Sequence, residues 1–334
     1  MKLSLAALLT AAAAASCPVQ AEMPAGYGFS KRVMAAKGGA VIVAPPGTVL
    51  TLKIINRTYS PAITIRGGTF SKIEIVGSGG IRFEKANVVR QDEADTLPLI
   101  LLRQASNVAF TQANVSAKRT AVGVSMRSVR NVRISDSSFS DLSNGVRGIG
   151  ADNLVLAGNR FRNIGVDGIG IGGLSNGQIS GNDLNYVSRW RPEKRGDHPD
   201  AIQLWDIEGV PSRNIVISGN RISVLGQGIF VKSENKGGFD NIEISGNDIS
   251  ADFSNGLALT YSRNSRISGN FVRTRTGTVN MAKIILIGNR GLTFVDNNAC
   301  KIGDKDNQFA SKKNIAVDWQ CPVMRQLPAV AANR

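Results

Sequence analysis

The segment Asn214-Ile-Val-Ile-Ser-Gly-Asn220 contains the repeating pattern from which the fold of this 334-residue chain can be predicted. It consists of an asparagine, two aliphatic residues with one residue between them, and a Ser-Gly-Asn triplet. Similar copies begin at Asn131, Asn153, Gly177, Asn241, Ser265 and Gly291. Successive copies begin 22, 24, 37, 27, 24 and 26 residues apart, and a period in this range is typical of a solenoid.

Each copy has the alternation of a strand with one buried face, and the runs are too short and too rich in glycine for helices. Stacked coils of such strands predict an all-β, single-domain, right-handed parallel β-helix with three short strands per coil. The Ser-Gly-Asn triplets at 180–182, 218–220, 245–247 and 268–270 put asparagines at one corner of successive coils. We interpret these asparagines as structural, because their amides can bond to one another and to the turn backbone.

The beginning of the chain has the form of a secretory signal peptide. Residues 1–21 combine one lysine, the apolar run Leu3–Ala15 and the small-residue site Val19-Gln-Ala21. We expect cleavage after Ala21 and export to the periplasm or the cell exterior, with lipid attachment at Cys17 as the alternative. No later segment is apolar enough to span a membrane.

The rest of the chain divides into three parts. We expect an N-terminal cap at residues 22–39, with a short helix at Ser30–Lys37. We expect the parallel β-helix at residues 40–300 and a C-terminal cap and tail at residues 301–334. Cys300 and Cys321 form an even pair in an exported protein, which favours a disulfide. Two cysteines and one distant histidine are too few for a zinc site.

The charge of the chain indicates a polyanionic partner. The formal net charge is +15, which attracts polyanions over long range. Export and an aromatic content of only 6% argue against nucleic acid, because proteins that bind single strands stack bases on aromatic side chains. An acidic polysaccharide is the expected partner and a monomer the expected state, while a basic protein without such a partner is the alternative.

One strand of each coil begins with a polar residue and a small one. Its copies start at Asn144, Asp167, Asp200, Gln227 and Asn255. Alternation sends the aliphatic residues of these strands inward and the intervening side chains outward. Because coils lie about 4.8 Å apart, the outward residues are expected to form one continuous strip for substrate binding. These residues are Arg147, Gln203, Trp205, Phe230 and Lys232.

The 37-residue coil is the enlarged one, and its surplus is assigned to residues 186–195. Insertions in solenoids gather on one face, which is often the binding face. This insertion carries Tyr186, Arg189, Trp190 and Arg195, so we expect a basic and aromatic wall above the strip. An ordinary solvated loop is the alternative.

The segment after the insertion, Asp197-His-Pro-Asp200, contains the only histidine in the chain. Histidine titrates near neutral pH, and an adjacent carboxylate can orient its ring. We therefore predict His198 as a catalytic acid or base, with Asp197, Asp200 and Tyr186 as further catalytic residues. A locally hydrogen-bonded loop histidine is the alternative.

Asp167 and Asp200 occupy the same position in successive coils. Stacked carboxylates repel unless one is protonated, a neighbour neutralises them or a cation bridges them. The pair could hold a calcium ion, which takes oxygen ligands, or perform acid/base chemistry. Alternatively, the whole polar column could serve only to satisfy the amides of the turns. The expected cofactor is therefore none or calcium.

The repeat resembles that of the pectin-lyase-like β-helix superfamily over residues 40–300. Asp197-His-Pro-Asp200 resembles the Asp-Pro-His-Asp motif of the β-helical mannuronan C5-epimerases, although histidine and proline are exchanged. The longer segment Asp197–Trp205 also looks like one found in secreted β-helix proteins linked to acidic polysaccharides. The resemblance implies proton transfer at a uronate, with His198 and an aspartate taking part.

These observations favour a secreted polysaccharide lyase or C5-epimerase that removes the C5 proton of a uronate. A β-helix glycoside hydrolase with an aspartate pair is the second hypothesis. A non-catalytic glycan-binding β-helix protein is the third, because this fold specifies no reaction.

Overall fold

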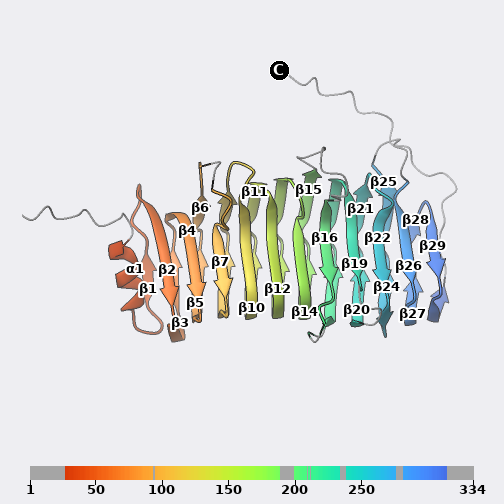
Figure 1. Cartoon of the computed structure of the whole chain (residues 1–334), viewed down its shortest axis with the longest axis horizontal. Coiled ribbons are helices and arrows are strands. Elements are labelled where there is room, and N and C mark those ends of the chain that lie inside the picture. Colours follow the sequence, from red (N-terminus) through yellow and green to blue (C-terminus); the bar gives the residue numbers. More distant parts are fainter. Residues whose placement is uncertain are drawn as a thin grey trace, which may run out of the picture.

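The computed structural model describes residues 27–92, 95–188, 199–208, 210, 212–233, 238–275 and 281–313, without the side chains of residues 186–188 and 312–313. The chain is an all-β solenoid of about ten turns with one short helix at its N-terminal end (Figure 1). Every register pairing between its named strands is parallel.

The pairings run along the molecule in three columns. Column A contains β1 (Val41–Val43), β3 (Thr58–Arg66), β5 (Gly79–Glu84), β8 (Ser106–Thr111), the second parts of β10 (Val122–Ser135), β12 (Asn144–Ala157) and β14 (Ile169–Ser180), then β17 (Ser212–Ser218), β20 (Phe239–Ser245), β23 (Ser262–Arg263), β24 (Arg266–Ser268), β27 (Arg290–Val295) and β30 (Gln308–Lys313).

Column B contains β2 (Val49–Ile55), β4 (Thr69–Val76), β7 (Ile100–Arg103), the first parts of β10, β12 and β14, then β16 (Asp200–Trp205), β19 (Gln227–Lys232), β22 (Asn255–Thr260), β26 (Lys283–Ile287) and β29 (Ile302–Lys305). Column C contains β6 (Asn87–Val89), β9 (Asn114–Ser116), β11 (Ser138–Leu142), β13 (Arg160–Ile164), β15 (Asp183–Ser188), β18 (Arg221–Leu225), β21 (Asp248–Ala251), β25 (Phe271–Thr274) and β28 (Asn298–Ala299).

The coils in the middle of the molecule differ from the expected three short strands. Strands β10, β12 and β14 each run through column B and column A, so these coils contain one long strand and one short one. In β10 the chain turns the corner with Ser128 and Asn131 at φ 53°. A single left-handed residue changes the strand direction while the parallel pairing continues on both sides, and asparagine tolerates that conformation better than most residues.

The interior is filled by the inward residues of all three columns, including stacked phenylalanines. The rings of Phe139 and Phe161 are 4.9 Å apart and nearly parallel. At the corner between columns C and B, a Cβ on Gly145 would come within 2.7 Å of the Phe161 ring and 2.5 Å of the carbonyl oxygen of Gly168. The glycine that follows the polar residue in this strand is therefore required by packing.

The corner between columns A and C is held by a buried ladder, which confirms that the triplet asparagines are structural. Its members are Asn159, Asn182, Asn220, Asn247, Asn270 and Asn297. The Oδ1 of each later member accepts the backbone N–H of the member before it, at 2.9–3.0 Å. Because backbone amides at a buried corner need partners, this ladder fixes the path of the chain there.

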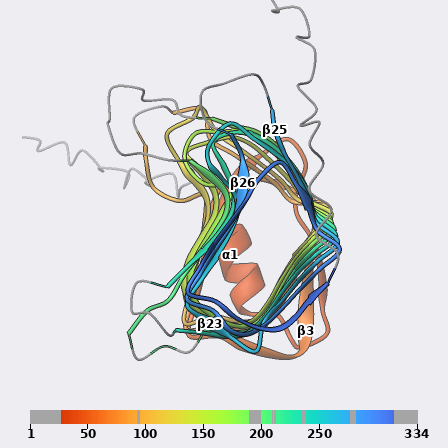
Figure 2. The same cartoon turned by 90° about the vertical axis from the view of Figure 1, so that its right-hand side faces the viewer.

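The short helix α1 (Tyr27–Met34) lies across the N-terminal end of the solenoid (Figure 2). It begins and ends three residues before the predicted helix at Ser30–Lys37. Its buried residues Phe29 and Val33 lie one turn apart, and the Phe29 ring is 6.1 Å from that of Phe70. These contacts cover the core and set the extent of the helix.

At the other end, β29 and β30 continue two columns beyond residue 300, where the sequence analysis ended the β-helix. Cys321 lies outside the described residues, so its disulfide with Cys300 stays a prediction. The signal peptide and lipidation at Cys17 also lie outside the described residues and stay predictions. No helix in the described part of the chain is both long enough and apolar enough to cross a membrane.

Candidate functional site

The predicted strip lies on the outward face of column B. Parallel register joins Arg147 of β12, through Gly170 of β14, to Gln203 of β16 and Phe230 of β19. Trp205 and Lys232 are register partners in the next row. Arg147 is exposed and the other four side chains are half-buried, while the alternating aliphatic residues between them are buried. We call the surface formed by Arg147, Gln203, Trp205, Phe230 and Lys232 the strip.

Trp205 lies over glycines of the preceding coil. A Cβ built on Gly172 would come 2.4 Å from the indole Nε1 of Trp205 and 2.5 Å from its Cε2. The indole therefore occupies the space that a side chain at position 172 would take. Because Trp205 is half-buried on this floor, it can offer an apolar ring face to a ligand.

Asp167 and Asp200 lie together, but their environments differ. The Oδ1 of Asp167 accepts the backbone N–H of Asp200 at 3.1 Å. Its Oδ2 lies 3.3 Å from the position of a Cβ on Gly170, and the Trp205 ring approaches the same position to 3.7 Å. Asp167 is half-buried, whereas the exposed fraction of Asp200 is 0%. Asp167 therefore presents one oxygen beside the strip, and Asp200 can act only through a neighbouring group.

Asp167 thus satisfies a turn amide, which is the structural role that the sequence analysis gave as the alternative to a functional one. The same column continues with Asn255, whose Nδ2 donates to the Gln227 side-chain oxygen at 2.7 Å. Among the described residues, no group of three or more His, Cys, Asp or Glu side chains could hold a metal ion. Calcium binding by Asp167 and Asp200 therefore has only this pair to support it.

The strip has an end on its C-terminal side. The two outward positions of β22 are Ala258, which is 1% exposed, and Thr260, which is 7% exposed. Thr260 does not extend the strip, because its Oγ1 accepts the backbone N–H of Ser233 at the buried corner. The accessible surface of column B is therefore interrupted at β22.

On its N-terminal side the strip continues into two arginines that the sequence analysis did not single out. Arg103 ends β7 and is the register partner of Arg127 in β10. Both are exposed, and Arg127 pairs in register with Ile149, two residues after Arg147. The spacing of 24 residues between the two arginines could have shown this, had the strand pattern been followed before residue 107.

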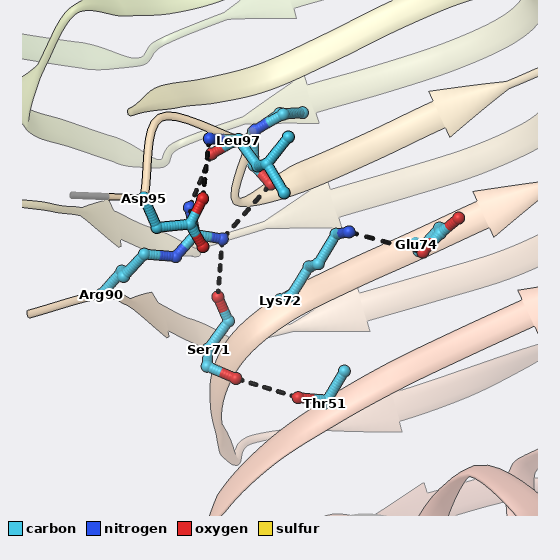
Figure 3. Close-up of polar contacts among 8 residues, drawn as sticks. Thr51, Ser71, Lys72, Glu74, Arg90, Asp95 and Leu97 are labelled. Carbon is cyan, nitrogen blue, oxygen red and sulfur yellow. Dashed lines mark hydrogen bonds and ion pairs between the residues drawn. The ribbon is translucent and has the colours of Figure 1, made fainter. Parts of the chain in front are cut away.

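A well-fixed loop borders this N-terminal part of column B. Arg90, which is 7% exposed, pairs with Asp95 at 3.2 Å and donates to the carbonyl oxygen of Leu97 at 2.6 Å (Figure 3). It also donates to the carbonyl oxygen of Ser71 at 3.4 Å. A buried arginine with this many acceptors holds residues 95–99 against β4 at the entrance to β7.

The enlarged coil gains residues on both sides of β16. Ile169 pairs with Ile202 in column B, whereas Gly177 pairs with Ile215 in column A, so part of the surplus lies after Trp205. There Ile207 and Val210 form a β-bridge. The sequence analysis had assigned the whole surplus to residues 186–195, because it could not distinguish one corner from the other.

Several predicted site residues lie outside the described part of the chain. These are Arg189, Trp190, Arg195, Asp197 and His198. Tyr186 lies in β15, but its side chain is also outside the description. Their roles therefore stay predictions.

One further carboxyl group, that of Asp252 between β21 and β22, has an altered pKa. Burial raises the pKa of Asp252, and the nearby Arg275 partly opposes this rise. The Oδ1 of Asp252 is buried and accepts no hydrogen bond among the described residues. Burial without such a bond favours the neutral form of a carboxyl group.

No protein-family model and no curated protein matches the chain. Several solved structures have a similar fold, among them the following three. The Dettilon tailspike protein gp208 aligns with a TM-score of 0.46 and 12% identity, covering 82% of this chain and 60% of the tailspike chain. Pectate lyase Pel9A aligns with a TM-score of 0.46 and 14% identity, covering 84% and 73%. The periplasmic alginate epimerase AlgG aligns with a TM-score of 0.37 and 13% identity, covering 79% and 65%.

The chain thus spans about three fifths of the tailspike chain that it matches. Its β-solenoid is consistent with the resemblance to the pectin-lyase-like superfamily drawn from the sequence. At these identities the likeness concerns the fold, and a fold of this kind does not specify a reaction.

Proposed function

We propose that this protein binds an acidic polysaccharide along the strip and acts on it as a uronate lyase or C5-epimerase. The observation that carries the proposal is the register that brings Arg147, Trp205 and Lys232 onto one face beside the Oδ2 of Asp167. The net charge of +15 supports a polyanionic ligand. The proposal includes export to the periplasm or the cell exterior and action as a monomer.

Both reactions begin with removal of the proton beside the uronate carboxylate. The site must therefore neutralise that carboxylate, supply a base and supply an acid. Arg147 and Lys232 are the cations of the strip that could neutralise it, and the Trp205 ring could support the sugar face. These interactions would position the C5 proton over Gly170, beside the Oδ2 of Asp167.

In this proposal His198 carries the proton. It lies two residues before Asp200 in the chain, and the buried carboxylate of Asp200 is suited to orienting a neighbouring group. Tyr186 is the candidate second proton carrier, and Arg189, Trp190 and Arg195 of the insertion are candidate substrate contacts. No step of this proposal is routed through calcium, for which Asp167 and Asp200 are the candidate ligands.

A hydrolase would need two carboxyl groups that reach the glycosidic bond from opposite sides. Asp167 and Asp200 are the pair available on adjacent coils. The complete burial of Asp200 counts against this use, because a catalytic carboxyl group must contact the substrate. We therefore favour proton abstraction over hydrolysis.

The test is incubation of the purified protein with alginate, pectate and glucuronan. Absorbance of unsaturated ends reports elimination, and the uronate ratio by NMR reports epimerisation. Reducing sugar without unsaturated ends would instead indicate hydrolysis. Binding without any of these products would indicate a glycan-binding protein. The proposal would be refuted if the protein neither bound nor altered any of the three polymers.

A further inference from the structure

Arg103, Arg127 and Arg147 carry positive charges on three successive strands of column B. Arg103 and Arg127 are direct register partners, and Arg147 projects from the following coil, β12. All three are exposed. Within the described part of the chain, none of the three has a carboxylate within ion-pair distance.

Several arginines on the other faces are paired with carboxylates, although Arg263 and Arg290 of column A are also register partners of like charge. On column C, Arg162 pairs with Asp183 of the next coil, and Arg273 pairs with Asp248 of the preceding coil. On column A, Arg66 pairs with Glu84 of the next coil at 2.9 Å. The solenoid thus places opposite charges on neighbouring strands at these positions, which stabilises a sheet.

The stacked arginines Arg103 and Arg127 of column B instead destabilise the sheet. Like charges directly opposite each other on neighbouring strands destabilise a sheet, and here two arginines are stacked in that way. A ligand that carries regularly spaced anions would relieve this repulsion. Guanidinium groups are also well suited to carboxylates, because they can donate two parallel hydrogen bonds.

We propose that Arg103 and Arg127 extend the substrate site, and that with Arg147 they bind successive carboxylates of a polyuronate whose chain runs along the solenoid axis. This inference rests on the proposed function, since it takes Trp205 and Lys232 as the other end of the same site. It assigns Arg103 and Arg127 to acidic sugar units that are bound without being chemically altered.

The geometry predicts how long the ligand must be. Column B passes from Arg103 in β7 through β10, β12, β14 and β16 to Lys232 in β19. Five spacings of about 4.8 Å make this distance about 24 Å. Trp205 is four spacings, or about 19 Å, from Arg103, so an oligosaccharide shorter than this cannot contact both residues, whereas a longer chain can.

The experiment compares two double variants of equal charge change. In R103Q/R127Q, neutral glutamines replace the two stacked arginines of column B. In the control R82Q/R133Q, two exposed arginines of column A are neutral, one in β5 and one in β10, two coils apart in the same register row. Affinities for acidic trimers and octamers of the polymer that the wild type binds, and for a methyl-esterified octamer, are measured by titration calorimetry at fixed ionic strength.

We expect R103Q/R127Q to lose about tenfold or more in affinity for the acidic octamer, from two partly solvated charge-assisted contacts. Its affinity for the trimer, and all affinities of R82Q/R133Q, should change by less than about twofold. An equal loss in both double variants, or an equal loss for trimer and octamer, would overturn the arginine track but leave the proposed function intact. A wild type that binds the esterified octamer as tightly as the acidic one would refute both.

Discussion

Replacing Asn182 by alanine should cost the protein a substantial part of its stability. The Oδ1 of Asn182 accepts the backbone N–H of Asn159 at 2.9 Å, and its Nδ2 donates to the carbonyl oxygen of Leu156 at 2.9 Å. Both bonds are buried, and the exposed fraction of Asn182 is 1%. Alanine would leave these two backbone groups without partners, at about 1–3 kcal/mol each, so we expect a loss of about 4 kcal/mol.

This loss converts into a measurable shift of the melting temperature. About 290 residues that unfold as one unit carry an unfolding entropy of roughly 0.6 kcal/mol/K, so a loss of about 4 kcal/mol lowers Tm by about 7 °C. The measurement is thermal unfolding of wild type and N182A followed by circular dichroism. The ladder lies at the corner between columns A and C, away from the strip, so turnover per folded molecule should be unchanged.

The matched control is Asn153→Gly, in a second and exposed ladder of bonded asparagines formed by Asn107, Asn131 and Asn153. The Nδ2 of Asn153 donates to Asn131 at 2.9 Å in an exposed position, and its φ is 54°, which glycine adopts without strain. Loss of this bond should cost under about 1 kcal/mol, because water can replace it. Equal Tm values for the two variants would refute the reasoning, since burial of the ladder would then have no energetic consequence.

Three further substitutions test the site and its surroundings. Gly172→Ala should displace the Trp205 indole, because the new Cβ would lie 2.4 Å from Nε1. Affinity for an acidic oligosaccharide should then fall about tenfold with little change in Tm, and an unchanged affinity would remove Trp205 from the site. Asp252→Asn should raise Tm at neutral pH. Burial holds the pKa of this carboxyl above its unfolded value, so its contribution to stability is present below the unfolded pKa and is lost as pH rises through the folded pKa. The Tm difference from wild type should therefore vanish near pH 3, roughly, and a pH-independent difference would contradict this. His198→Ala should lower turnover by about 10²–10⁴-fold at unchanged Tm, as expected for a proton carrier. A destabilised but active His198→Ala protein would show that this histidine is structural.

The sequence contained enough information to predict the solenoid, the asparagine ladder and the composition of the strip. These features depend on local rules that repeat in each coil. Alternation fixes which residues of a strand point inward, so Ile202 and Leu204 are buried while Gln203 and Trp205 face outward. A polar residue followed by a small one recurs because the coils meet a similar packing constraint at the same corner, as at Gly145 and Ala201.

Three features of the site depended on tertiary structure, because they arise from contacts between coils of unequal length. Arg103 and Arg127 meet in register since their two coils are offset by 24 residues, whereas Arg147 follows 20 residues later and lies one row away. Asp167 and Asp200 have the same position in the repeat, yet only Asp167 reaches the strip, because Asp200 is completely buried. Trp205 lies over Gly172 only because the register of β14 and β16 pairs these two positions. Local pattern determines which side of a strand a residue faces, but the burial and partners of that residue are set by the neighbouring coils.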